Sequence, residues 1–298
     1  MNGVLSLDLG GTNLRAAVAH VDHPADLIML GKWPAPTSVE GFVRLVRELY
    51  NGAAFSQCPE GIGITVPGLV EGTRCQWVPN LPHLDGVDLA EALDSMGSPV
   101  VAANDAQLAL LAEAVLGRAR EIENALLLSL GTGIGSAVLA AGRIVRGAHG
   151  HACSFGWACA DVHDMGADRS GWLERAASGR SVDMAAAALV PPRDGAAVIA
   201  GVRRGESSCV AVIERITQAL GTALAGAVSL LDPSLVLLTG GLSDAADILV
   251  PRMADTLRRH LPPRLRDIRI EPGAFGSRAG LVGAAIAATK GGDWWDLR

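Results

Sequence analysis

The feature that most constrains this chain is a strand, a glycine-rich turn and a second strand that occur twice. The first copy runs from Val4 to His20 around Gly10-Gly11, and the second runs from Ala125 to Ala140 around residues 131–135. Short apolar runs that meet at a glycine turn are typical of β-hairpins. Two copies of one such unit indicate a duplicated fold with a ligand site between the halves.

Strands and helices alternate through the rest of the chain, which is typical of an α/β fold. Helical spacing places Phe42, Val46 and Leu49 on one face of a helix. Further helices are expected at residues 89–96, 106–116, 206–231 and 279–290, further strands at 61–66, 99–103, 234–238 and 268–271, and an outer hairpin at 70–78. Residues 147–180 lack such periodicity and predict an irregular loop that enters a helix near Gly171.

Composition narrows the functional classes. With 298 residues, 49% hydrophobic and 19% charged, the chain can fold into one large domain or two moderate ones. A formal net charge of -6 argues against a nucleic-acid partner. The N-terminus does not read as a signal peptide, and the apolar stretch 210–231 is interrupted by Glu214, Arg215 and Gln218. We therefore expect a soluble, cytoplasmic protein with no membrane partner.

The cysteines do not indicate a disulfide framework. The five cysteines form no C-x-x-C pair, which favours free thiols over a disulfide framework or a metal site.

The first glycine turn, after Asp8, is a candidate phosphate-binding turn. Glycine leaves room there for backbone N–H groups to approach a phosphate. Asp8 is a candidate to hold Mg²⁺ through water. The candidate nucleotide-binding residues of this turn are Asp8, Gly10, Gly11, Thr12 and Asn13. The alternative is an ordinary hairpin turn.

Two further glycine turns extend the phosphate-binding pattern. Gly131, Thr132 and Gly133 follow one apolar strand, and Gly240-Gly241 follow another. Ligands gather at the carboxyl ends of strands in such folds, so the last turn suits the ribose and base of a nucleotide. No G-x-x-x-x-G-K-[ST] segment is present, which excludes a P-loop enzyme.

Asn104 and Asp105 follow the strand expected at 99–103. A carboxylate beside an amide at a strand end can accept a proton from a sugar hydroxyl while the amide fixes the ring. Phosphoryl transfer needs positioning, a base and charge neutralisation rather than covalent help. The alternative is that Asp105 caps the helix expected to begin at Ala106. Both roles are compatible.

In this order along the chain, the motifs resemble those of the ROK family of sugar kinases. The resemblance covers essentially the whole chain and rests on Asp8–Asn13, Val66–Gly68, Pro79–Pro82, Asn104–Ala106, Gly131–Gly135, Arg146–Gly150, Leu173-Glu174, Thr239–Gly241 and Gly280–Ala284. Repressors of that family carry an N-terminal helix-turn-helix, whereas this chain begins at the phosphate hairpin, so we expect a kinase.

The resemblance implies an α/β fold of the actin/hexokinase (ribonuclease H-like) type, with two domains and with sugar and ATP in the cleft between them. We expect a small domain of residues 1–105 plus 285–298 and a large domain of residues 106–284. By the same resemblance Asp105 is the catalytic base, Asn104 a sugar ligand, and Gly68 and Asn80 neighbours of the sugar. ATP and Mg²⁺ are the expected cofactors, and a homo-oligomer (dimer or tetramer) is a further expectation.

The chain departs from the family where family kinases carry G-E-x-G-H, whose Glu and His bind the sugar and whose His also binds zinc. Ser154 stands in place of that Glu and Trp157 in place of that His. Met165, Ala167 and Trp172 stand where the family has three zinc cysteines, so we predict that structural zinc is absent. An apolar cluster of Phe155, Trp157, Met165 and Trp172 is the predicted replacement.

These departures predict altered sugar recognition with the 6-hydroxyl chemistry retained. The expected substrate-binding residues are therefore Gly68, Asn80, Asn104, Asp105, Ser154, Trp157 and Glu174. A zinc-free member resembles the kanosamine kinases of ansamycin-antibiotic pathways, with Glu174 available to an amino group. The alternatives are a glucokinase, a kinase of an N-acetylated amino sugar, and a non-catalytic sugar sensor. The Trp294-Trp295 pair reads either as an exposed tail or as an interface anchor.

Overall fold

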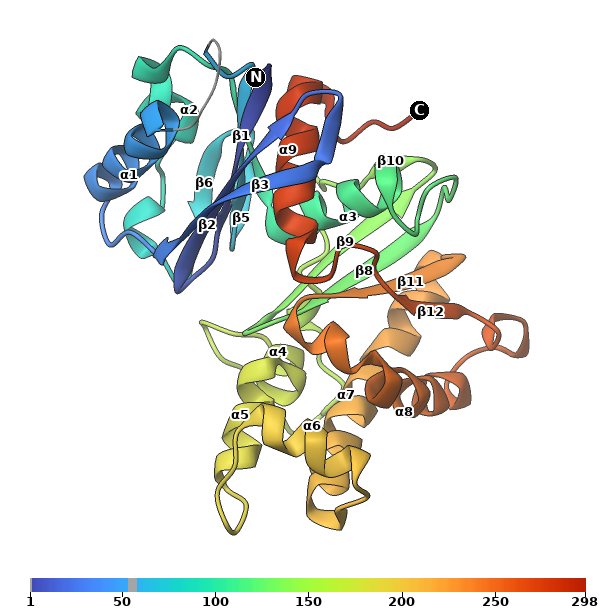
Figure 1. Cartoon of the computed structure of the whole chain (residues 1–298). Helices are drawn as coiled ribbons and strands as arrows, with labels where there is room; N and C mark the ends of the chain where they lie inside the picture. The colour runs from blue at the N-terminus through green and yellow to red at the C-terminus, as the bar shows by residue number, and fades with distance from the viewer. Residues whose placement is uncertain (1, 53–57) are drawn as a thin grey trace. The chain divides into compact units, whose positions relative to one another are not determined.

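The computed structural model describes residues 2–52 and 58–298. The chain divides into two compact units (Figure 1). The first comprises residues 1–121, 139–152 and 278–298, and the second comprises residues 122–138 and 153–277. These boundaries differ from those expected at 105/106 and 284/285. Helix α3 (Asp105–Leu116) and the start of helix α9 (Ala279–Lys290) belong with the first unit.

Backbone contact explains why α3 and α9 stay together. A Cβ atom on Gly283 of α9 would lie 1.7 Å from the carbonyl oxygen of Leu108 in α3. A glycine is therefore required there, because any side chain would push the two helices apart. Gly63 of strand β4 (Gly61–Val66) meets α9 in the same way, since its Cβ would lie 1.9 Å from the oxygen of Ala284. One helix is thus packed tightly against both α3 and the sheet of the first unit.

The sheet of the first unit has the strand order β3-β2-β1-β4-β7. β1 pairs antiparallel with β2 and parallel with β4, which in turn pairs parallel with β7. The strands and remaining helices of this unit are β1 (Gly3–Leu9), β2 (Asn13–His20), β3 (His23–Pro34), α1 (Val39–Gly52), β4 (Gly61–Val66), β5 (Leu69–Glu71), β6 (Arg74–Trp77), α2 (Leu89–Leu93), β7 (Val100–Asn104) and β10 (Arg143–Ile144). The predicted hairpin at residues 4–20 is confirmed.

Alternation along β1 accounts for the two faces of this sheet. Leu5, Leu7 and Leu9 belong to one core cluster with Phe42 and Val46 of α1. Val4 instead packs with Ala285 and Ala288 of α9. Since α1 and α9 cover opposite faces, β4 is buried along its whole length, as expected for a strand in a covered parallel sheet.

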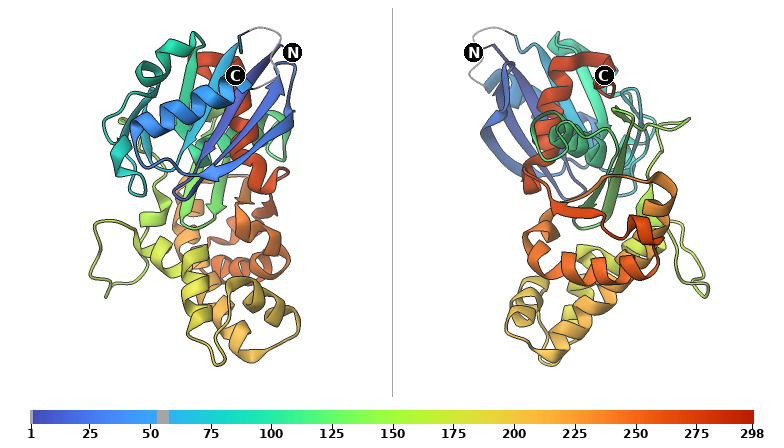
Figure 2. Two further views of the ribbon diagram at one scale, coloured as in Figure 1. Left: turned by 60° about the vertical axis from the view of Figure 1, so that its left-hand side comes forward. Right: turned by 90° about the vertical axis from the view of Figure 1, so that its right-hand side faces the viewer.

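The second unit contains most of a second sheet, whose strand order is β10-β9-β8-β11-β12. Its elements are β8 (Ala125–Leu130), β9 (Ile134–Ala140), α4 (Trp172–Ala177), α5 (Gly179–Ala187), α6 (Gly195–Arg203), α7 (Ser207–Leu231), β11 (Leu235–Thr239), α8 (Ala246–Arg259) and β12 (Arg269–Pro272). The second predicted hairpin, at 125–140, is confirmed, and the unit boundary falls within β9. None of the described helices is both long and apolar enough to cross a bilayer. Figure 2 shows the helices of this unit from two further directions.

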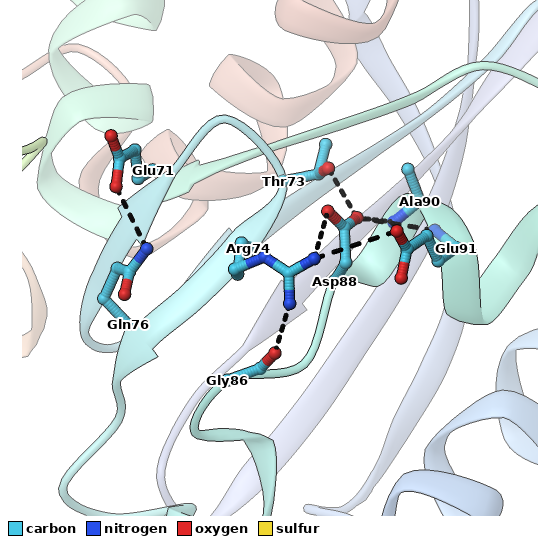
Figure 3. Close-up of polar contacts among 8 residues, drawn as sticks. All are labelled: Glu71, Thr73, Arg74, Gln76, Gly86, Asp88, Ala90 and Glu91. Atoms are coloured by element: carbon cyan, nitrogen blue, oxygen red, sulfur yellow. Dashed lines mark hydrogen bonds and ion pairs between the residues drawn. The ribbon is translucent and has the colours of Figure 1, made fainter.

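The outer hairpin expected at 70–78 is confirmed as the short hairpin β5–β6, which is tied to helix α2 (Figure 3). Arg74 donates a hydrogen bond of 2.7 Å to the oxygen of Gly86 and lies 3.6 Å from the carboxylate of Asp88. Asp88 is the N-cap of α2 and accepts from the hydroxyl of Thr73 at 2.7 Å and from the N–H of Ala90 at 3.0 Å. The bond from Thr73, followed by those from the helix backbone, lowers the pKa of Asp88.

We predict that Asp88→Ala lowers the free energy of unfolding by about 1–2 kcal/mol, the cost of losing an N-cap and its partners. Because the pKa of Asp88 is lowered on folding, its contribution is present at neutral pH and is lost as the pH falls below about 4. Urea unfolding at pH 7 and at pH 3.5 measures both effects. The matched control is Asp94→Ala at the exposed end of the same segment, and an equal loss in that control would contradict the assignment.

Candidate functional site

Asp8 lies near the end of β1, where strand register gives it two polar neighbours. It is paired with Arg15 on β2 and with Thr65 on β4. The hydroxyl of Thr65 donates to Asp8 Oδ1 at 2.6 Å, and Arg15 Nε donates to Asp8 Oδ2 at 2.9 Å. Arg15 Nη2 forms a further ion pair with the same oxygen. Both carboxylate oxygens are therefore held, which suits contact with a cation through water rather than direct ligation.

The first glycine turn closes directly after Asp8. The N–H of Gly10 donates to the oxygen of Asn13 at 2.8 Å. A Cβ atom on Gly11 would lie 2.8 Å from the Cβ of Asn80. Glycine at position 11 therefore makes room for Asn80, a reason that the sequence did not reveal. The structure thereby brings a predicted nucleotide-binding turn and a predicted sugar neighbour together, and Thr12 in this turn is exposed.

Asn104 connects the end of β7 to the turn after β4. It is paired with Val66, so its side chain lies beside the turn that contains Gly68. Asn104 Nδ2 donates to the oxygen of Gly68 at 3.0 Å, while Asn104 Oδ1 accepts from the N–H of Ala106 at 3.0 Å. Asn104 is thus the N-cap of α3, and α3 begins at Asp105. The prediction that Asp105 caps a helix beginning at Ala106 was wrong by one residue.

Gly68 itself has little space. Its Cβ would lie 2.4 Å from the oxygen of Trp77 and 2.9 Å from the Cα of Val78. The turn that accepts the Asn104 hydrogen bond is therefore packed on the backbone that leads from β6 to Asn80. Gly68, Asn80 and Asn104 form one connected group in the first unit.

Asp105 is the carboxylic acid of this site whose pKa is raised. It remains partly exposed, and its Oδ1 accepts from the N–H of Ala106 at 2.8 Å. Burial of the carboxyl, and then the negative charge of Asp8, raise the pKa of Asp105 to about 6, against the opposing effect of the hydrogen bonds at the helix start. At pH 7 to 8 this carboxylate is ionised but has an unusually high proton affinity, which is the property of a general base.

The structure also shows neighbours of Asp8 that sequence analysis missed. Thr65 and Arg15 were not predicted, although the register of adjacent strands would have indicated both. Gly280 near the start of α9 is a third, because its Cβ would lie 3.3 Å from Asp8 Oδ1. Gly280 was noted only as part of a motif, since a helix start far along the chain carries no local signal for its partner.

In the second unit, the other two glycine turns lie next to each other. β8 and β11 pair in parallel, with Ser129 opposite Thr239, so their carboxyl ends coincide. Gly240 has φ = +83° and its Cβ would lie 2.6 Å from the oxygen of Leu130. By contrast, a Cβ on Gly131 or on Gly241 would meet open space. These turns leave room for a ligand to approach the backbone.

Two observations test whether a nucleotide suits these turns. Among the side chains of residues 2–52 and 58–298, Thr239 Oγ1 is the one buried polar atom without a hydrogen-bond partner. Thr239 ends β11, immediately before Gly240-Gly241, where a ribose or an ordered water can satisfy it. The turn at Gly131–Gly133 is held from the other side, since the N–H of Gly179 donates to the oxygen of Gly131 at 2.8 Å. The residues present therefore fit a nucleotide.

Glu174 contacts the turn at Gly131–Gly133. Its Oε2 accepts from the N–H of Ile134 at 3.1 Å, and a Cβ on Gly133 would lie 2.5 Å from that oxygen. The loop with Ser154 and Trp157 packs alongside, since a Cβ on Gly156 would lie 2.8 Å from the oxygen of Ile134. The second unit thus brings together Glu174, Ser154, Trp157 and the turn at 131–133. The other predicted sugar-binding residues, Gly68, Asn80, Asn104 and Asp105, belong to the first unit.

The predicted apolar cluster around Met165 is wrong. Met165 is 97% exposed and Trp157 is 42% exposed. The loop is tied by charge instead, because Arg175 Nη2 donates to both carboxylate oxygens of Asp164 at 2.6 and 2.7 Å. Within the described part of the chain, no three His, Cys, Asp or Glu side chains are grouped to hold a metal ion, and all five cysteines are free. The absence of zinc stays a prediction.

Comparisons with known proteins agree with this architecture. A glucokinase from Streptomyces coelicolor is 29% identical over 315 residues, which cover 97% of this chain and 98% of that protein. An N-acetyl-D-glucosamine kinase from Yersinia enterocolitica is 30% identical over 303 residues, covering 94% of this chain and 97% of that protein.

Among solved structures, a ROK family glucokinase from Streptomyces griseus in complex with glucose and AMPPNP superimposes with a TM-score of 0.83 at 26% identity, covering 97% of this chain and 100% of that chain. The two-sheet α/β fold is thus of the actin/hexokinase type, as predicted. The model of the ROK family matches residues 4–290. The chain therefore belongs to the ROK family.

Proposed function

We propose that this sugar kinase transfers the γ-phosphoryl group of ATP to the 6-hydroxyl of a glucose-like hexose, with Asp105 as the general base. The observation that carries the proposal is the Asp105 carboxylate at the end of β7, whose pKa of about 6 reflects its burial and the charge of Asp8. A group with this proton affinity accepts the hydroxyl proton more readily than an ordinary aspartate and is still ionised at neutral pH.

The remaining residues of the site are proposed to bind the sugar, the nucleotide and Mg²⁺. Asn104 holds the turn at Gly68 with one Nδ2 hydrogen and has the other free for a sugar oxygen. Ser154, Trp157 and Glu174 of the second unit are the proposed contacts to the rest of the sugar. The backbone of the three glycine turns is proposed to hold the nucleotide. Mg²⁺, when bound near Asp8, neutralises charge on the phosphates, and Arg15 and Thr65 keep that carboxylate in place.

The sugar itself is a finer proposal. Relatives of this chain include a glucokinase and an N-acetyl-D-glucosamine kinase, so glucose and amino sugars are both supported as substrate classes. We propose kanosamine (3-amino-3-deoxy-D-glucose), because Ser154 and Trp157 replace the charged sugar ligands typical of the family. Glu174 Oε2 accepts from the N–H of Ile134, and among the described residues Oε1 has no hydrogen-bond donor and is available to an ammonium group. Glucose is the alternative substrate.

A panel of sugars tests whether kanosamine is preferred to glucose. We expect ATP-dependent ADP release with hexoses that have a free 6-hydroxyl, and the highest kcat/KM with kanosamine among kanosamine, glucose, glucosamine, N-acetylglucosamine and mannose. Equal or better use of glucose would overturn the kanosamine assignment and leave the kinase assignment intact. If no sugar supported ADP release while sugar binding persisted, the protein would be a sensor.

Asp105→Asn is expected to lower kcat by at least about 10²-fold, the typical cost of losing a positioned base, with little change in sugar affinity. Steady-state kinetics and sugar titration separate the two effects. Asp94→Asn, an exposed site in the same unit, is the matched control. An Asp105→Asn enzyme with unchanged kcat would remove Asp105 from the chemistry.

The same substitution is expected to stabilise the fold at neutral pH. The pKa of Asp105 is raised from 3.8 to about 6 on folding, so between these values the unfolded chain ionises first, and stability falls as the pH rises through that range. At pH 7.5 Asp105→Asn should raise the free energy of unfolding by about 1–3 kcal/mol, and at pH 4 by much less. Urea unfolding at the two pH values measures this, and a destabilised variant at pH 7.5 would contradict it.

The pH dependence of the wild-type enzyme follows from the same group. A base must be deprotonated to act, so kcat/KM for the sugar should rise with pH up to about 6 and then level off. Initial rates from pH 5 to 8 at saturating ATP test this. A flat profile across that range would show that another group accepts the proton.

A further inference from the structure

Trp295, in the C-terminal segment 294–298, lines an open cavity in the first unit. The N–H of Ile144 donates to the oxygen of Trp295 at 2.9 Å, and the N–H of Leu297 donates to the oxygen of Gly142 at 3.1 Å. Trp294 is buried at 5% exposure. The tail is therefore fixed along β10, so the prediction of an exposed tail was wrong for Trp294, and a role as an interface anchor stays a prediction. The cavity has a volume of about 540 Å³.

Two arginines of this cavity face the ring of Trp295. The Cζ atoms of Arg143 and Arg146 lie 5.7 and 6.0 Å from its centroid. Arg143 has a carboxylate partner, because its Nε and Nη2 both lie 3.0 Å from Asp296 Oδ2, an oxygen that Arg298 also contacts. Arg146 differs: within residues 2–52 and 58–298, its guanidinium is partly buried and has no carboxylate or other hydrogen-bond acceptor. It also lines a second cavity of about 330 Å³.

We propose that Arg146 and Trp295 form a binding site for a small anion, a phosphate- or carboxylate-bearing metabolite. A guanidinium offers paired donors that match either group, and the aromatic ring holds it in place at little entropic cost. The volume is within the range of small-molecule sites. Glu71 lines the same cavity and is held by Gln76 Nε2 at 3.0 Å, so its charge disfavours polyanions and selects a ligand with a single anionic group.

The position of Arg146 links this site to sugar binding. Arg146 immediately precedes residues 147–152, which pack on the β5 strand, since a Cβ on Gly150 would lie 2.4 Å from the oxygen of Val70. β5 begins one residue after Gly68, whose oxygen accepts the hydrogen bond from Asn104. An anion on Arg146 is therefore expected to change KM for the sugar and to leave KM for ATP unchanged. The site itself does not depend on the proposed function, because binding is measured directly.

The experiment titrates the full-length protein with inorganic phosphate, acetate and glucose 6-phosphate at constant ionic strength set by chloride, and follows heat and tryptophan fluorescence. We expect saturable binding that Arg146→Gln weakens at least about tenfold, whereas Arg146→Lys, which keeps the charge, retains part of it. Trp295→Phe should remove the fluorescence change while heat is still released. Thermal unfolding of each variant establishes that it is folded.

Comparison of the three titrations distinguishes a phosphate-bearing ligand from a carboxylate. Tighter binding of phosphate and glucose 6-phosphate than of acetate assigns a phosphate-bearing metabolite, and the reverse assigns a carboxylate. No response beyond that of chloride in the wild-type protein would overturn the site. Equal binding in wild type and Arg146→Gln would also overturn it. A change of oligomeric state in Arg146→Gln, measured by sedimentation, would assign this face to a second copy of the chain instead.

Discussion

The parallel pairing of β1, β4 and β7 underlies the site of the first unit. It places Asp8 beside Thr65 and Val66 beside Asn104, so three strand ends supply the polar groups of one edge of the sheet. The hydrogen bond from Thr65 to Asp8 and the hydrogen bond from Asn104 to Gly68 then hold the Asp8 and Asn104 side chains in place. A shift of one residue in the register of β4 would turn Thr65 to the other face of the sheet and leave Asp8 without that donor.

The electrostatics of Asp105 follow from this arrangement. Partial burial of its carboxyl and the nearby charge of Asp8 both disfavour ionisation, while the hydrogen bonds at the start of α3 favour it. Holding a carboxylate with this high proton affinity therefore lowers the free energy of unfolding at neutral pH. Arg15 limits the cost, because its ion pair with Asp8 partly offsets the repulsion between the two carboxylates. Such opposition between stability and function is common at catalytic sites.

Sequence analysis anticipated the features that depend on local pattern. The two hairpins, the turns at Gly10 and Gly131, and the placement of Asn104 and Asp105 at a strand end all follow from short-range signals. It missed features that depend on distant partners. The 12-residue β3 was not expected, because its residues are largely exposed and lack alternation. The unit boundaries differ because Gly283 binds α9 to α3 across the chain. Met165 was expected in a core, yet a loop held by Asp164 and Arg175 leaves it exposed.

The base proposed for phosphoryl transfer and several residues proposed for sugar recognition belong to different units. In the part of the chain that the structure describes, the side chains of Asp105 and Asn104 form their hydrogen bonds within the first unit. The loop with Ser154 and Trp157 is anchored within the second unit, where the N–H of Phe155 donates to the buried Ser136 hydroxyl at 3.2 Å. Substitutions in that loop therefore leave the bonds around Asp105 intact. Under the proposed roles, the contacts to the sugar in the second unit and the base in the first unit are held by separate sets of bonds, so one set can be substituted without disturbing the other.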